Sequence, residues 1–164
     1  LTSRSGVLLG VVGELLAGGR TSRLVSELVL SGRALSATVV TDYPGERHPG
    51  LALVYGIPKD GDRPEDVAAL LRSQLSALLV EGGVREAELA RVRRAARAAL
   101  LGAAQSNTSM AATLATYHVN NGSWRGLLEE LELVSGVRPA EVQQLAARVF
   151  APDNCFTGYV TRAA

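Results

Sequence analysis

The spacing of the apolar residues changes twice along this chain, and this change is what most limits the folds available to it. In Gly6–Ala17 the apolar residues recur as on one face of an α-helix. Between Ala34 and Ile57 they alternate with other residues, as in a half-buried β-strand. From Pro64 onward the helical spacing returns. The pattern predicts an α+β fold with a small sheet.

Seven helices and three strands are expected. The helices are Gly6–Ala17, a second that begins after Thr21 or Ser22 and ends at Gly32, Pro64–Glu81, Arg85–Gln105, Ser106–Asn120, Ser123–Val134 and Pro139–Phe150. The strands are Ala34–Tyr43, Leu51–Ile57 and Cys155–Thr161. The order α-α-β-β-α-α-α-α-α-β predicts one domain over residues 1–164, with an antiparallel or mixed sheet packed against several helices.

The chain is expected to be a fragment of a larger, two-domain parent. It opens with Leu1 and no Met, and three strands make a thin sheet for so many helices, so we expect a further strand before Leu1. Its single Lys59 beside sixteen Arg indicates a G+C-rich genome. A bacterial origin is expected, and the residues ahead of Leu1 would decide between cytoplasm and periplasm.

Composition argues against nucleic-acid binding and membrane insertion. The net charge is only +1, and no apolar run reaches the roughly 18 residues of a membrane span. One helix is rich in arginine, but Glu86 and Glu88 dilute its charge and no aromatic residue accompanies it, so a solvated face is expected; its basic residues are Arg85, Arg91, Arg93, Arg94 and Arg97. A nucleic-acid module using this helix is the weakest alternative.

No catalytic or metal-binding motif is present. The only histidines, His48 and His118, lie far apart and neither begins an H-x-x-E-H or H-E-x-x-H pattern, so we expect no zinc site and no cofactor in this chain. Gly18-Gly19 is interpreted as a helix stop rather than a phosphate loop. The single Cys155 excludes an internal disulfide and is expected to be buried in a strand.

Several motifs, in one order, resemble the pitrilysin/insulinase-type zinc metallopeptidases. The run from Glu14 to Leu28 contains Gly18-Gly19 and Ser22-Arg23-Leu24, and it leads into Ala34-Leu35-Ser36-Ala37. This is similar to the family's helix, Gly-Gly stop and "SRLY.ELR...GLAYS" segment. Gly83–Ala90 is similar to its "GVTEAELERAK" helix start, and Val134–Asn154 is similar to its closing segment.

The resemblance implies the second, non-catalytic half of such a peptidase. Family members pair two related α/β halves, of which the first carries the H-x-x-E-H zinc motif. This chain would then form one wall of a chamber for unfolded peptide, and zinc would be held by a separate catalytic domain or subunit. A homodimer formed through the incomplete sheet is a further expected partner arrangement.

One departure from the family leaves two interpretations open. Many second halves offer the substrate an Arg and, seven residues later, a Tyr, and these positions hold Val29 and Ser36. Neither can stabilise a tetrahedral oxyanion as Arg and Tyr could. Arg33 and Tyr43 lie nearby in the sequence, but they do not fall at the positions of the family's Arg and Tyr. The chain resembles either a half from a paired-subunit enzyme such as the mitochondrial processing peptidase, or a peptidase relative that has lost its activity.

The sequence also leads to an expected role for two of the helical regions and to one alternative function. Val67–Leu79 is interpreted as core rather than as a peptide groove, and Ser106–Tyr117 as an inter-domain contact. The alternative function is an assembly or scaffold domain, like the core proteins of the respiratory cytochrome bc complex. An H-x-x-E-H motif elsewhere in the parent would separate these functions.

Overall fold

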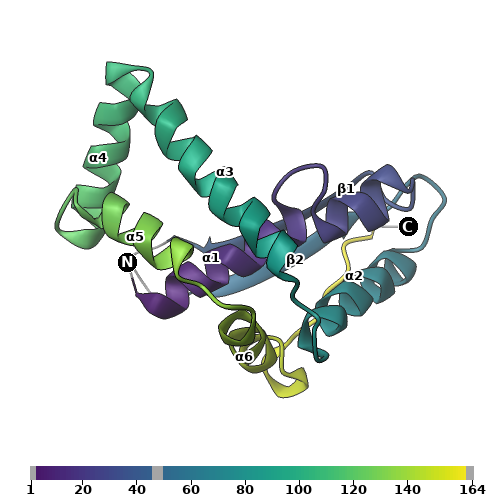
Figure 1. Cartoon of the computed structure of the whole chain (residues 1–164). Coiled ribbons are helices and arrows are strands. Elements are labelled where there is room, and N and C mark those ends of the chain that lie inside the picture. The colour runs from purple at the N-terminus through teal and green to yellow at the C-terminus, as the bar shows by residue number, and fades with distance from the viewer. Residues whose placement is uncertain (1–2, 46–49, 162–164) are drawn as a thin grey trace.

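A computed structural model describes residues 3–45 and 50–161 and has an α+β fold. The element order is α1 (Arg4–Ala17), the π-helix η1 (Val25–Leu30), β1 (Ser36–Tyr43), β2 (Leu51–Ile57), α2 (Pro64–Leu79), α3 (Glu86–Ala104), α4 (Asn107–Asn121), α5 (Gly126–Ser135), α6 (Pro139–Val149) and the 3-10 helix η2 (Pro152–Asn154) (Figure 1). The strands β1 and β2 form a two-stranded antiparallel sheet. The α+β class and the antiparallel pair agree with the prediction.

The core lies between the sheet and a layer of helices. The helix α1 packs on β1, α2 packs on β2, and α6 packs on both α1 and α2. The helices α3 and α4 form a hairpin that projects away from this layer (Figure 1). Fully buried side chains come from most of these elements: Val12, Leu15, Leu16, Leu24, Leu28, Leu78, Leu89, Val137 and Val142. Each such side chain contributes about 1.5–3 kcal/mol to folding.

The interpretation of Val67–Leu79 as core agrees with the structure. Val67, Leu71 and Leu78 are buried on α2, and Leu70 and Leu75 pack against the core beside them. Leu79 is the exception, because at the last position of α2 it is 39% exposed.

Two glycines let the helix layer approach the sheet closely. A Cβ atom on Gly13 of α1 would lie 2.9 Å from Thr41 Cγ2 of β1. A Cβ atom on Gly56 of β2 would lie 2.8 Å from Val67 Cγ1 of α2 and 3.3 Å from the Ser36 carbonyl oxygen. Because real Cβ atoms do not approach so closely, these glycines set how near the two layers lie.

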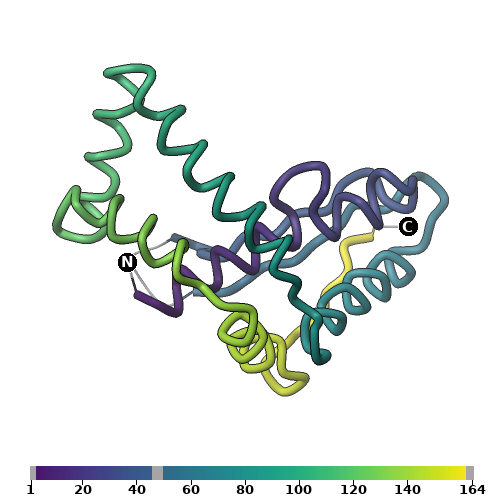
Figure 2. Tube along the Cα trace, viewed as in Figure 1, coloured from purple at the N-terminus to yellow at the C-terminus, as the bar shows by residue number. Residues whose placement is uncertain are grey.

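The predicted third strand, Cys155–Thr161, is wrong. Figure 2 traces this segment as an extended chain beyond α6. It takes no part in the described sheet, and its Phe156 and Val160 are 95% and 98% exposed. Cys155 is also exposed rather than buried in a strand. Its residue types favour an extended backbone, but a strand also needs a neighbouring edge to pair with, and local sequence does not supply one.

The close packing at Gly56 generates a test with a matched control. The Gly56→Ala variant is expected to lower the free energy of unfolding by about 1–2 kcal/mol, because the added methyl group displaces Val67. Gly102 lies in α3 with open space around it, so Gly102→Ala is expected to raise stability by about 0.5–1 kcal/mol. Urea unfolding measures both, and equal effects at the two sites would contradict the packing argument.

Candidate functional site

Arg23 and Glu88 form an ion pair that joins the segment after α1 to the first turn of α3. Arg23 Nη2 lies 2.8 Å from Glu88 Oε2, and Arg23 Nε donates to Glu88 Oε1 at 2.9 Å. Arg23 also donates to the Gly83 carbonyl. The two side chains are only 13% and 14% exposed. This motif arginine therefore anchors the fold.

The other motif residues are structural as well. Gly18 caps α1, and Gly19 has φ +84°, which favours glycine and ends the helix as expected. Ser22 is buried and donates from Oγ to the Gly19 carbonyl at 2.7 Å. Leu24 is fully buried in the core. The structure thus brings Gly18, Gly19, Ser22, Arg23 and Leu24 together as one turn that carries the chain from α1 into η1.

Glu88 is held in its charged form by this arrangement. Burial by itself would raise the pKa of Glu88, but hydrogen bonds from the Arg23 side chain and from the Arg85 backbone and side chain outweigh it and lower the pKa to about 2. The Arg85 backbone N–H donates to Glu88 Oε2 at 3.0 Å. Glu88 therefore caps α3 and binds Arg23 at once.

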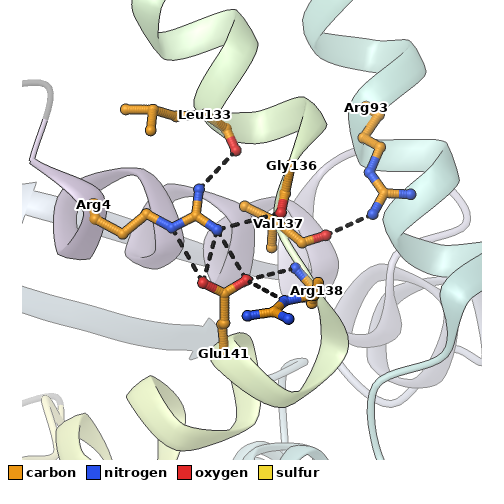
Figure 3. A network of polar contacts seen from close by, with 7 residues as sticks. All are labelled: Arg4, Arg93, Leu133, Gly136, Val137, Arg138 and Glu141. Carbon is orange, nitrogen blue, oxygen red and sulfur yellow. Dashed lines mark hydrogen bonds and ion pairs between the residues drawn. The ribbon is translucent and has the colours of Figure 1, made fainter.

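A second anchor of the same design joins α1, α5 and α6 (Figure 3). Arg4 Nη2 lies 2.8 Å from Glu141 Oε1, and Arg4 also donates to the carbonyls of Leu133 and Gly136. The Arg138 backbone N–H donates to Glu141 Oε2 at 3.0 Å. The hydrogen bond from Arg4 is the main cause that lowers the pKa of Glu141.

The two anchors share a sequence signature that the sequence analysis missed. Gly83–Glu88 reads Gly-Val-Arg-Glu-Ala-Glu and Gly136–Glu141 reads Gly-Val-Arg-Pro-Ala-Glu. In both, the glutamate is the third residue of a helix, and a distant arginine binds the glutamate and the glycine carbonyl. The repeated hexapeptide could have revealed the capping, but not which arginine binds it.

Three arginines of the basic helix form hydrogen bonds or ion pairs with other residues of the chain. Arg91 donates to the carbonyls of Glu14 and Gly18 at the end of α1. Arg93 pairs with Glu86 and donates to the Val137 carbonyl at 2.6 Å, which ties α3 to the second anchor. Arg85 pairs with Glu88 at 3.3 Å. These contacts give the three arginines a structural role, and for Arg91 and Arg93 the expectation of a solvated face is wrong.

Val29 and Ser36, which stand where the resemblance would place Arg and Tyr, lie apart from both anchors. Val29 is half-buried in η1 and packs against the core. Ser36 begins β1 opposite Ile57. Neither offers a cationic or phenolic group. Tyr43 lies at the far end of β1 from Ser36, so it does not replace the missing tyrosine.

The outer face of the sheet is apolar and open. Gly56 and Val54 of β2 face the helices, so the alternate residues of β2 and their cross-strand partners face outward. These are Ser36, Thr38, Val40 and Tyr43 of β1 and Leu51, Leu53, Tyr55 and Ile57 of β2. Leu51 is 63% exposed, Tyr43 53% and Ile57 49%. An exposed, mostly apolar face is typical of a surface that contacts another molecule.

A cleft of about 930 Å³ opens beside the edge of β1. It lies between α1, β1, α3, α4 and α5, and glycine and alanine residues form much of its wall. Its polar side includes Tyr117, which donates to Glu130 Oε2 at 2.9 Å. Glu14 and Asp42 lie at the cleft as well.

No metal centre is found in the part of the chain that the structure describes. Its His, Cys, Asp and Glu side chains form no group of three that could hold an ion. His118 is exposed in α4, and His48 lies outside the described residues. Within residues 3–45 and 50–161, no helix has the length and apolar character needed to cross a bilayer.

Comparison with solved structures places this fold. It matches the inactive peptidase domain of a candidate zinc protease from Bordetella parapertussis with a TM-score of 0.74 and 22% identity, over 96% of this chain and 85% of that chain. A candidate zinc protease from Bordetella pertussis Tohama I gives 0.72 and 22%, over 93% and 82%. The fold is that of a zinc-protease-like domain.

A third match shows that such a domain can be part of a longer chain. A protease from Helicobacter pylori has a TM-score of 0.72 and 21% identity over 89% of this chain, which spans only 35% of that protease. No protein-family model matches the sequence, and no curated protein matches it significantly.

The Arg23–Glu88 ion pair, the first of the two anchors, is expected to make the free energy of unfolding depend on pH in the acidic range. Arg23→Met is expected to lower the free energy of unfolding at pH 7 by about 2 kcal/mol, because it leaves Glu88 charged, largely buried and without its main partner. The folded-state pKa of Glu88 lies below its ordinary 4.5, so its contribution is present above pH 4.5 and disappears as pH falls toward 2. The stability gap between wild type and variant should close over this window.

An exposed ion pair provides the control for that prediction. Arg63 and Glu65 lie 3.5 Å apart and are 75% and 49% exposed. Arg63→Met is expected to change stability by less than about 0.5 kcal/mol at every pH. Denaturant unfolding from pH 7 to pH 2 measures both variants, and a gap for Arg23→Met that does not depend on pH would contradict the role assigned to Glu88.

The second anchor is expected to control local opening at the start of α6. Arg4→Met should speed hydrogen exchange at the backbone N–H groups of residues 137–142 other than Pro139, because Arg4 no longer holds Glu141 and the Gly136 carbonyl. The control is Arg138→Met, whose side chain is 79% exposed. Exchange that rises equally in both variants would show that Arg4 has no special role.

Proposed function

We propose that this chain is the non-catalytic domain of a pitrilysin/insulinase-type zinc metallopeptidase. Three features support the proposal: a fold similar to an inactive peptidase domain, a sequence without H-x-x-E-H, and the ordered motifs around Ser22-Arg23-Leu24. On this proposal residues 1–164 are one domain of a larger parent, and zinc is held by a catalytic domain or partner subunit.

The observation that carries the function is the open, apolar face of the β1–β2 sheet. Helices cover the other face, and the outward side chains Tyr43, Leu51, Tyr55 and Ile57 are about half exposed or more. In our proposal this face is one wall of the peptide-binding chamber. Apolar side chains would contact those of an unfolded peptide, and folded proteins would be too bulky to enter. Zinc, when bound in the catalytic half, supplies the activated water.

The helix α4 is the proposed contact with that catalytic half. It has no fully buried residue, although it is 15 residues long. Its sequence is rich in Ser, Thr and Asn, which suits a polar interface between domains.

A second function is favoured by one observation, the presence of Val29 and Ser36 where many family members have Arg and Tyr. A parent that has lost peptidase activity would not need those groups. The chain would then be an assembly domain, and the open sheet face would contact a permanent partner protein.

The parent protein, or this chain co-expressed with the subunit that carries H-x-x-E-H, provides the test. We expect the isolated chain to bind no stoichiometric zinc and to cleave no peptide, and the assembled protein to hold one zinc and cleave unfolded peptides. An isolated chain with one tightly bound zinc would contradict the proposal. An assembly without zinc or activity would support the alternative function.

Substitution on the sheet face tests the chamber wall directly. Tyr55→Asp is expected to lower kcat/KM of the assembled enzyme for an unfolded peptide about tenfold or more, because it places a charge on an apolar contact surface. Leu101→Asp is the control, since Leu101 is 67% exposed on α3 and away from the sheet. Zinc content and unfolding midpoint should stay unchanged in both. Equal activity of the two variants would contradict a role for the face.

A further inference from the structure

Arg93 connects the helix that begins at the first anchor with the turn that the second anchor holds. Arg93 lies in α3, and its Nη2 donates to the Val137 carbonyl at 2.6 Å (Figure 3). Val137 follows Gly136, whose carbonyl accepts a hydrogen bond from Arg4 of the second anchor. Arg93 and Arg4 therefore bind two successive carbonyls in the short turn between α5 and α6.

The other attachment of Arg93 lies in the first turn of its own helix. Arg93 Nη1 pairs with Glu86, the first residue of α3. The Glu86 side chain is 64% exposed, so the capped first turn of α3, rather than burial, fixes its position. Arg93 Nε is buried and has no hydrogen-bond partner among the described residues, which is unfavourable. The position of Arg93 therefore depends on both of its acceptors, Glu86 and the Val137 carbonyl.

A second route joins the same elements, so the contacts form a closed ring. Arg91 donates to the Glu14 carbonyl at 2.8 Å and to the Gly18 carbonyl, at the end of α1. The beginning of α1 holds the second anchor through Arg4. The ring thus runs from the second anchor along α1, across Arg91 to α3, and across Arg93 back to the second anchor. Because helices are rigid elements, a change at one contact of such a ring is passed to the others.

We propose that Arg93 couples the two anchors, so that opening of the Arg23–Glu88 pair loosens the start of α6. When Arg23 is released, the first turn of α3 loses its charged attachment to the segment after α1. Glu86 shares that turn, so it holds Arg93 less firmly, and the Val137 carbonyl loses its donor more often. The turn between α5 and α6 then opens more often, although its contacts with α1 are intact. This coupling does not rest on the proposed peptidase role.

Hydrogen exchange in a double-mutant cycle tests the coupling in the full chain. Arg23→Met is expected to speed exchange at the backbone N–H groups of residues 137–142, other than Pro139, about threefold or more beyond its effect on residues 71–78 of α2, which serve as the reference for global unfolding. In the Arg93→Met background this excess should disappear. An excess that is absent in the wild-type background, or equal in the two backgrounds, would overturn the proposal.

The coupling should also run in the opposite direction, because a coupling free energy between two sites is reciprocal. Arg4→Met weakens the second anchor and is expected to speed exchange at the Glu88 and Leu89 N–H groups of α3 by a similar excess, about threefold or more, while Arg93 is present. A purely local role of Arg93 would not produce this effect at the distant anchor. Excess exchange in one direction alone would contradict the coupling.

Two variants separate the bridge that Arg93 forms from the general charge of the helix. Arg94→Met removes a neighbouring, exposed arginine of α3 and should leave the effect of Arg23→Met on residues 137–142 unchanged. Glu86→Ala removes the other end of the bridge at an exposed position and should abolish that effect, as Arg93→Met does. Circular dichroism checks that each variant is folded, and Glu86→Ala carries the test if Arg93→Met does not fold. Loss of the effect in Arg94→Met, or its persistence in Glu86→Ala, would show the proposal to be wrong.

Discussion

The fold depends on two arginines that each bind the first turn of a distant helix. Arg23 joins the turn after α1 to the start of α3, and Arg4 joins the beginning of α1 to α5 and α6. In each case one glutamate caps its own helix and accepts the arginine, so helix capping and tertiary contact use the same carboxylate. Because charge-assisted hydrogen bonds are directional, these anchors set where the helices begin.

The anchors surround α1 and thereby determine what the sheet can do. With α1 held at both ends, Gly13 lies against Thr41 and the helix layer covers one face of β1 and β2. The opposite face has no described element over it and is apolar. A sheet with one open, mostly apolar face offers a surface for contact with another molecule. Among the described residues, His, Cys, Asp and Glu side chains form no group of three that could hold a metal ion.

Sequence reasoning was strongest where contacts are local. The stripe on α2 and the helix stop at Gly18-Gly19 follow from periodicity and backbone freedom within a few residues. It failed at Cys155–Thr161, whose strand-like composition describes a preference without a pairing partner. It also left the partner of Arg23 unknown, because Glu88 lies 65 positions further along the chain.

The amino-acid sequence alone determined the helices, the β1–β2 pair, the α+β class, the turn at Ser22-Arg23-Leu24 and the lack of an H-x-x-E-H motif, since each depends on residue type and short-range spacing. Only the tertiary structure decided that Leu51, Tyr55 and Ile57 face outward. An alternating strand has one apolar side, but which side is covered depends on where α1 and α2 pack. That placement depends on long-range contacts, which local spacing does not encode.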